Sequence, residues 1–201
     1  MSLRPSRIVG ICAILALAWI TFNTITTDAP GGKGVAAGAA LPPFAAPLAP
    51  ARLEGDASVA LQARDGHPAA CAIRGADILN SCQLAQRGPV AIAFFITRSG
   101  RCGDAVDELD ALRPRFPGIG FAAVAIRGSR DDVRAEIRER GWGLPVAWDR
   151  DGAVANAYAV SVCPTITLAR RGGRVEATLL GVQPRAELER RLARLSGSAS
   201  P

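Results

Sequence analysis

Residues 90–103 of the chain read Val-Ala-Ile-Ala-Phe-Phe-Ile-Thr-Arg-Ser-Gly-Arg-Cys-Gly, and this stretch decides the fold. Its first seven residues are all apolar, which is typical of a short strand buried on both faces. A polar turn then leads to Cys102, and an amphipathic helical pattern follows with apolar residues at Val106, Leu109 and Leu112. The stretch therefore predicts a buried strand, a turn, and a helix with a cysteine in its first turn.

The remainder of the chain alternates between apolar strand patterns and amphipathic helix patterns. Strands are predicted at 90–96, 119–126, 144–148, 165–169 and 174–180, and helices at 100–112, 130–140, 153–158 and from Pro184 onward. This alternation predicts the α/β class, with a mixed central sheet flanked by helices on both faces. A second cysteine, Cys163, stands directly before Pro164 and Thr165, where the fourth of these strands begins.

The N-terminus carries an almost continuous apolar run from Ile8 to Ile25. As a helix it would be about 27 Å long, close to the thickness of a hydrocarbon core. Arg4 and Arg7 precede the run, and positive charge on this side favours a cytoplasmic N-terminus. We therefore predict a cytoplasmic segment 1–7, a transmembrane anchor 8–27 and an extracytoplasmic remainder; a cleaved signal peptide, giving a secreted protein, is the alternative.

Composition divides the rest of the chain. Residues 28–50 are rich in Ala, Gly and Pro with almost no charge, which predicts a linker. Residues 51–84 then form an N-terminal extension, residues 85–196 the folded domain, and residues 197–201 a flexible tail. An extracytoplasmic domain would lie in an oxidising compartment, where disulfides persist.

Charge and histidine content exclude several classes of function. The formal net charge is +6, from 24 basic and 18 acidic residues, but the arginines are scattered among acids, which argues against a nucleic-acid-binding face. His67 is the only histidine, which argues against a Cys-His protease and a histidine-based metal site. No metal and no organic cofactor is expected.

The order of elements and their motifs resembles the thioredoxin-like superfamily. The similarity is to its membrane-tethered, extracytoplasmic thiol–disulfide oxidoreductases and their redoxin relatives, the AhpC/TSA-like proteins. The matching pieces are Gly88-Pro89-Val90 into Phe94-Phe95, Ser99 to Cys102, 107–109, 146–158 and 162–165. The resemblance implies a cis Pro164, a Cys163 placed against Ser99 and Cys102, and protein thiols or disulfides as partners.

The chain departs from the family where that family has Cys-x-x-Cys, because it has Ser99-x-x-Cys102. Three interpretations follow. Cys102 and Cys163 could form a displaced redox pair, with Ser99, Arg101, Pro164 and Thr165 lining the substrate groove. Cys102 could instead be a peroxidatic cysteine, because peroxiredoxins carry Thr/Ser-x-x-Cys at this turn. In the third interpretation catalysis is lost, any Cys102–Cys163 bond is structural, and the domain is a binding module.

Cys71 and Cys82 lie eleven positions apart, before the first strand of the predicted sheet. In an oxidising compartment they predict a local structural disulfide that pins the N-terminal extension. The alternative is that one of them exchanges with Cys102. Four extracytoplasmic cysteines permit three complete pairings, and the sequence does not choose among them.

Overall fold

The computed structural model describes residues 14–15, 19, 33–64 and 66–197. The predicted anchor, residues 8–27, therefore lies outside the described residues except for Ile14, Leu15 and Trp19, and residues 1–7 lie outside them entirely. Among the residues that are described, no helix combines the length and the apolar character needed to cross a bilayer. Every element discussed below belongs to one unit, residues 32–201.

A mixed five-stranded sheet forms the centre of this unit. The elements are, in chain order, β1 (Ala45–Pro47), η1 (Ala70–Ala72), β2 (Ile78–Asn80), α2 (Ser81–Arg87), β3 (Val90–Ile96), α3 (Gly100–Leu112), η2 (Arg113–Arg115), β4 (Gly120–Arg127), α4 (Arg130–Arg140), β5 (Val146–Trp148), α5 (Ala153–Ala157), β6 (Thr165–Ala169), β7 (Val175–Leu180) and α6 (Arg185–Gly197). The sheet order is β5-β4-β3-β6-β7. Strands β3, β4 and β5 are parallel, whereas β6 and β7 are antiparallel additions.

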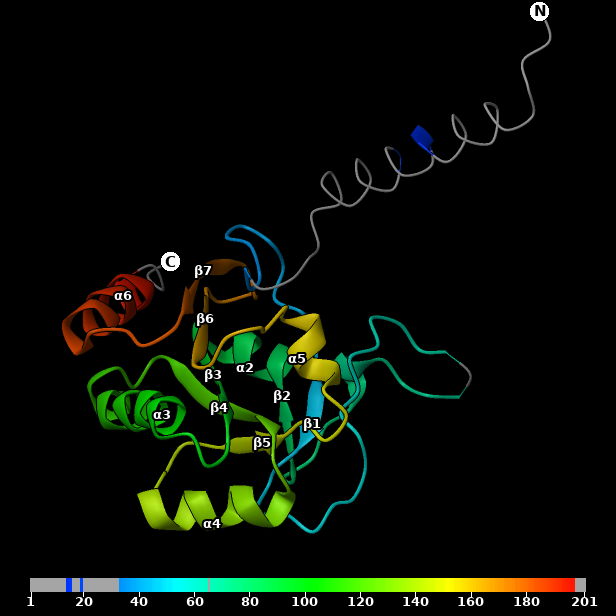
Figure 1. Cartoon of the computed structure of the whole chain (residues 1–201), viewed down its shortest axis with the longest axis horizontal. Helices are drawn as coiled ribbons and strands as arrows, with labels where there is room; N and C mark the ends of the chain where they lie inside the picture. The colour runs from blue at the N-terminus through cyan, green and yellow to red at the C-terminus, as the bar shows by residue number, and fades with distance from the viewer. Residues whose placement is uncertain (1–13, 16–18, 20–32, 65, 198–201) are drawn as a thin grey trace, which may run out of the picture. The chain divides into compact units, whose positions relative to one another are not determined.

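The two faces of the sheet are covered by different layers, because successive side chains of a strand point to opposite faces. Ala91, Ala93 and Phe95 of β3 share a buried cluster with the apolar residues of α3, α4 and α6. Ile92 and Phe94 face the other way, toward residues of β1, α2 and α5. Figure 1 shows α3 and α6 on one side of the strands and α5 and β1 on the other.

The elements predicted for residues 88–197 are confirmed, with small shifts at their ends. The predicted strand 119–126 is Gly120–Arg127, and the predicted strand 144–148 begins only at Val146. The second shift follows from Pro145, which has no N–H to donate to a strand ladder. The helical patterns place Leu109 and Leu192 fully inside the core, as expected.

The predicted linker 28–50 is wrong for its described part. Phe44 and Ala49 are completely buried, and β1 within this segment pairs with β2. Arg130 of α4 holds the segment, because its guanidinium donates to the carbonyl oxygens of Ala49 at 3.1 Å and Leu48 at 2.8 Å. Small alanines let the segment lie close against the sheet, so low charge here indicates packing and not a tether.

The predicted boundary between residues 84 and 85 is also wrong, because it falls inside helix α2. Asn80 begins this helix, and its side-chain oxygen accepts a hydrogen bond from the N–H of Gln83 at 3.0 Å. The described residues between 33 and 87 are called the N-terminal layer below, because β1, β2 and α2 among them cover one face of the sheet. The predicted tail 197–201 lies outside the described residues except for Gly197, which ends α6.

Candidate active site

The topology of the sheet brings the two distant cysteines together. Strand β6 runs antiparallel to β3, with Thr165 opposite Phe94, so the start of β6 meets the end of β3. Helix α3 begins just after β3, and the residue before the β6 start is Pro164. Cys102 and Cys163 consequently form a disulfide, with their Cα atoms 5.5 Å apart. The Cys163–Pro164 peptide bond is cis, as the resemblance implies.

The two cysteines of this disulfide differ in exposure. Cys102 lies in the first turn of α3 and is 2% exposed, whereas Cys163 is only half-buried. Cys163 also lines an open groove, which Cys102 does not, so Cys163 is the cysteine that a partner arriving from solvent meets first. This difference assigns distinct chemical roles to the two cysteines.

Ser99 occupies the N-cap of α3 but makes no capping hydrogen bond to the backbone. Its hydroxyl instead donates to the sulfur of Cys102 at 3.1 Å. A hydroxyl that donates to sulfur stabilises negative charge on that sulfur, and the N-terminal end of a helix acts in the same direction. The serine that replaces the usual first cysteine thus still acts on the second.

The turn between β3 and α3 is held by α4. Arg98 has a φ of +60°, in the left-handed region that non-glycine residues rarely adopt. Its backbone N–H donates to the buried carboxylate of Glu136 at 3.2 Å, and its guanidinium pairs with Asp132. Hydrogen bonds from Ser129 and from Arg98 lower the pKa of Asp132. These contacts hold the strained turn in place, so that Ser99 lies against the disulfide.

Gly103, directly after Cys102, leaves room for a charged side chain at the start of α3. A Cβ at this position would lie 2.4 Å from the guanidinium carbon of Arg140. Arg140 pairs there with Asp104 at 3.1 Å and Asp107 at 2.6 Å. Glycine is therefore needed at this position if the guanidinium is to lie beside the active-site turn.

The predicted groove residues are brought together only in part. Arg101 is exposed, and Pro164 is buried beneath the half-buried Cys163. Thr165 is completely buried, and its hydroxyl donates to the carbonyl of Val162 at 2.7 Å. Thr165 therefore supports the loop from below, and its assignment to the groove surface is wrong.

A groove of about 480 Å³ runs beside Cys163, and most of its lining was missed by sequence reasoning. Its walls include Ile96, Arg127, Asn156 and Val162. Ile96 and Arg127 end the parallel strands β3 and β4, and binding residues gather at such strand ends in open α/β sheets. That rule was the one available signal; nothing in the sequence distinguishes Asn156.

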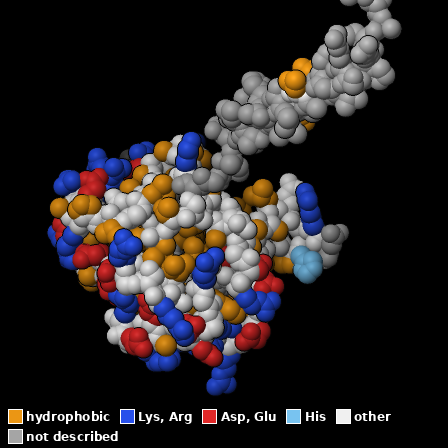
Figure 2. Space-filling view, in the orientation of Figure 1, with side chains coloured by type: hydrophobic (Ala, Val, Ile, Leu, Met, Phe, Trp, Pro, Cys, Tyr) orange, Lys and Arg blue, Asp and Glu red, His pale blue; other side chains and the backbone are white. Residues whose placement is uncertain are grey.

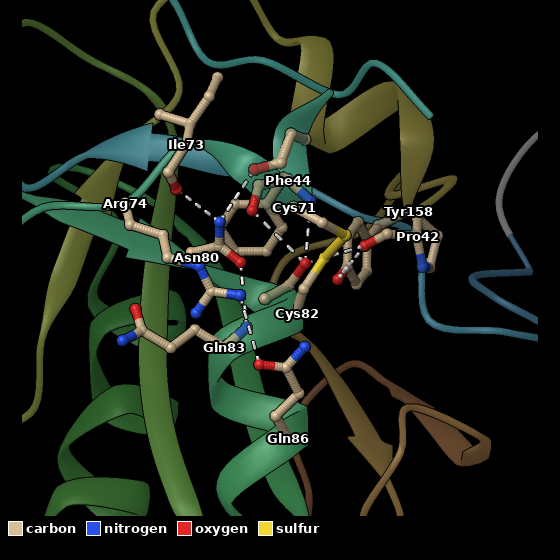
Figure 3. The surroundings of a disulfide bond; sticks show 12 residues. Pro42, Phe44, Cys71, Ile73, Arg74, Asn80, Cys82, Gln83, Gln86 and Tyr158 are labelled. Carbon is tan, nitrogen blue, oxygen red and sulfur yellow. Dashed lines mark hydrogen bonds between the residues drawn. A yellow bond between two sulfur atoms is a disulfide. The ribbon is translucent and has the colours of Figure 1, made fainter. Parts of the chain in front are cut away.

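The second disulfide joins Cys71 to Cys82, with the Cα atoms 5.4 Å apart, and confirms the predicted local bridge. It connects η1 to the first turn of α2 in the N-terminal layer. Cys71 is exposed and Cys82 is half-buried. Figure 3 shows the bond beside Asn80 and the side chains that surround it.

Surface charge is mixed on the face shown in Figure 2, where basic and acidic side chains are interspersed. Many arginines are ion-paired, including Arg150 with Asp56 and Arg185 with Glu108. Among the residues that the structure describes, no group of three or more His, Cys, Asp or Glu side chains could hold a metal ion.

Comparison with solved structures places this architecture. A thiol:disulfide interchange protein of the thioredoxin family from Chlorobium tepidum TLS superposes with a TM-score of 0.61 at 14% identity, over 81% of this chain and 99% of that one. A secreted Mycobacterium tuberculosis disulfide oxidoreductase homologous to E. coli DsbE gives 0.54 at 19% identity, over 59% and 89%. The chain has the thioredoxin-like fold. At sequence identities this low, the similarity shows the fold and not the function.

Sequence comparison finds thioredoxin-like relatives as well. The chain is 24% identical over 109 residues to the thiol-disulfide oxidoreductases ResA of Bacillus anthracis and Bacillus thuringiensis strain Al Hakam. The match covers 53% of this chain and 63% of those proteins, so the chain spans less than two thirds of the curated relatives it matches. No family model matches the chain.

Proposed function

We propose that this thioredoxin-like protein is an extracytoplasmic thiol–disulfide oxidoreductase that exchanges disulfides with protein partners through Cys102 and Cys163. The observation that carries the proposal is the Cys102–Cys163 disulfide with one reachable sulfur, at the side of a groove. The similarity to ResA supports the same class of reaction. The redox pair is displaced: the cysteine before the cis proline replaces the missing first cysteine of Cys-x-x-Cys.

The exposures dictate the order of events. A partner thiolate attacks the sulfur of Cys163, the bond to Cys102 breaks, and Cys102 leaves as a thiolate. A second thiol of the partner then attacks the partner's own sulfur in the mixed disulfide and releases Cys163. Two partner thiols are oxidised to a disulfide and the protein is reduced to a dithiol, with the two protons passing from the partner's thiols to those of the protein. Run in reverse, Cys163 attacks a partner disulfide and Cys102 resolves the mixed disulfide.

Cys102 is suited to be the leaving group and the resolving group. The hydroxyl of Ser99 donates to its sulfur, and the N-terminal end of α3 favours negative charge there. Its burial keeps a partner from attacking the wrong sulfur. The groove lined by Ile96, Arg127 and Val162 then receives the chain that flanks the partner's cysteine.

Location outside the cytoplasm is part of the proposal. The apolar run 8–25 after Arg4 and Arg7 supports a single-pass anchor with its N-terminus in the cytoplasm, and cleavage would release a secreted domain. Two disulfides in the domain support an oxidising compartment. The Mycobacterium tuberculosis neighbour is a secreted protein. Protease digestion of intact cells should remove the domain while sparing cytoplasmic markers.

Exchange is favoured over the two alternatives. A peroxidase would need Cys102 open to peroxide, whereas its sulfur is buried and bonded to Cys163. A purely structural bond would have no need of a hydroxyl aimed at one sulfur and an open groove beside the other.

The reduction potential of each bond and trapping of mixed disulfides test the proposal together. The Cys102–Cys163 bond should equilibrate at roughly −270 to −120 mV, the range of known oxidoreductases. Cys102→Ser should accumulate partner proteins on Cys163, and the matched Cys163→Ser should accumulate none. A bond that resists reduction below about −300 mV, as structural disulfides do, would leave a binding module.

A further inference from the structure

We infer that Cys71–Cys82 is a second thiol–disulfide exchange site, which takes a protein cysteine flanked by uncharged residues. The starting observation is its exposure: Cys71 lies on the surface, and Cys82 is half-buried. Cys71 is therefore more exposed than Cys163, the more accessible cysteine of the first site, and Cys82 is half-buried as Cys163 is. Exposure of this kind distinguishes labile disulfides from inert ones.

The cysteines are held together by contacts other than the bond itself. Asn80, 2% exposed, donates from its side-chain amide to the carbonyls of Ala70 at 2.9 Å and Ile73 at 2.7 Å, on either side of Cys71. The same side chain caps the helix that carries Cys82 (Figure 3). One buried amide thus ties η1 to the start of α2, so the two cysteines stay adjacent when the bond is open.

A second tie lies further along the same two segments. The guanidinium of Arg74 donates to the side-chain oxygen of Gln86 in α2 at 3.4 Å. Asn80 and Arg74 already hold these segments together, so a disulfide with a purely structural role would add little. A pair of thiols kept adjacent by other contacts can instead close and open repeatedly, which is what an exchange site requires.

The surroundings of the bond specify the partner. A pocket of about 310 Å³ opens beside it, lined by Leu41, Pro43 and Leu61 among others. None of the described residues that line it carries a charge. Leu61 is 79% exposed at its rim. A cysteine between uncharged residues can bury apolar surface against this lining, whereas glutathione carries two carboxylates and little apolar surface to bury.

The reaction balances with a partner dithiol as the reductant. One partner thiolate attacks the exposed sulfur of Cys71, the S–S bond breaks, and Cys82 leaves as a thiolate. The partner's second thiol attacks the partner sulfur of the mixed disulfide and releases Cys71. The partner becomes a disulfide and the Cys71–Cys82 pair becomes a dithiol, with the two protons passing from the partner's thiols to Cys71 and Cys82.

The test uses the full chain with Cys102→Ser and Cys163→Ser, so that Cys71–Cys82 is the only disulfide of the described residues that can open and the outcome does not depend on the first site. A synthetic peptide with one cysteine between alanines, and separately glutathione, are the probes. Opening of the bond is followed by alkylation and mass spectrometry. The peptide should open the bond at least about tenfold faster than glutathione, and amide protection of residues 66–87 should persist in the dithiol form.

Three further variants sharpen this test. Leu61→Ser should slow the peptide and not glutathione, while Leu53→Ser, a partly exposed leucine outside the pocket, should change neither. Asn80→Asp keeps the helix cap but removes both donors, and should lower the equilibrium constant for reclosing the bond by about tenfold. Should the double cysteine variant fail to fold, the wild-type chain gives the same readout for each bond separately.

Two results would overturn the inference. One is a Cys71–Cys82 bond that stays closed in the wild-type chain while the peptide opens Cys102–Cys163. The other is a bond whose opening abolishes amide protection across residues 66–87, since the bond would then be a staple after all.

Discussion

The two disulfides of this protein have nearly the same span, with Cα separations of 5.5 and 5.4 Å, but very different settings. Cys102–Cys163 lies at one end of the central strands, where β3 ends and β6 begins. Cys71–Cys82 lies in the N-terminal layer, residues 33–87. The comparison teaches that a disulfide's role depends on which sulfur a partner can reach and on what holds the cysteines when the bond opens.

The largest expected effect comes from a variant that destabilises the N-terminal layer and leaves the first site unchanged. Arg130 is 7% exposed, and its guanidinium donates to carbonyls of Leu48, Ala49 and Leu53. Arg130→Met leaves these acceptors without that donor and should lower the free energy of unfolding by about 3 kcal/mol in urea titrations. Amide exchange should accelerate in residues 44–50, while the reaction rate of Cys102–Cys163 stays within about twofold.

Arg134→Met is the matched control for this variant. Arg134 lies one turn along α4 and donates to the carbonyls of Ala49 and Ala51, but it is half-buried, so its removal should cost about 1 kcal/mol. Equal losses in the two variants would contradict the expected effect of burial. Faster amide exchange in β3 and β6 than in residues 44–50 would contradict the separation of the two regions.

The next effect concerns the first site alone. Ser99→Ala removes the hydroxyl that donates to the sulfur of Cys102 at 3.1 Å. A hydrogen bond of about 1 kcal/mol that stabilises the leaving thiolate should slow opening of the Cys102–Cys163 bond by about fivefold to tenfold. Stopped-flow measurements with a peptide thiol give the rate. The opening rate of Cys71–Cys82 in the same variant is the internal reference and should not change.

Much of this architecture could be predicted from the sequence, and the exceptions have a physical cause. Residues 90–112 carry their own periodicity, so the strand and helix of the first site follow from local pattern. Residues 40–50 have none: alanine and proline pack against the sheet through tertiary contacts, and composition alone suggests a linker. Spacing indicated the Cys71–Cys82 bridge.

The residues that line the groove beside Cys163 also could not be predicted from local sequence patterns. The position of Cys163 beside Cys102 came from the resemblance, since no local pattern links residues 61 positions apart. Arg127 lines the groove because β4 ends there, and Asn156 does so because α5 lies beside it. Such convergence depends on the sheet order, which the sequence pattern does not specify in advance.

A smaller effect should be the same for both disulfides. The hydroxyl of Thr167 is completely buried in β6 and has no hydrogen-bond partner among the described residues. Thr167→Val keeps the shape and removes the unpaired polar group, so the free energy of unfolding should rise by about 1 kcal/mol. Denaturation with both bonds intact measures it. A decrease would mean that the hydroxyl has a partner after all, and a change in either exchange rate would mean that the two sites are coupled through the sheet.

The smallest expected effect is a pH dependence of the unfolding free energy, and it comes from a buried carboxylate near the first site. Asp149 is 2% exposed and accepts hydrogen bonds from the N–H groups of Val154 and Ala155, which fixes α5 beside the Cys163 groove. Burial raises the pKa of Asp149 above its ordinary value of 3.8, although the two N–H groups oppose the shift. Since the folded state holds this proton more tightly than the unfolded state, the group stabilises the fold most below pH 3.8. That contribution is lost as the pH rises through the folded-state pKa.

The unfolding free energy of wild type minus that of Asp149→Asn should therefore decrease with rising pH across this window. The variant's constant loss of one acceptor cancels in the slope, and a difference that is flat or increases with pH would place the folded-state pKa at or below the ordinary value.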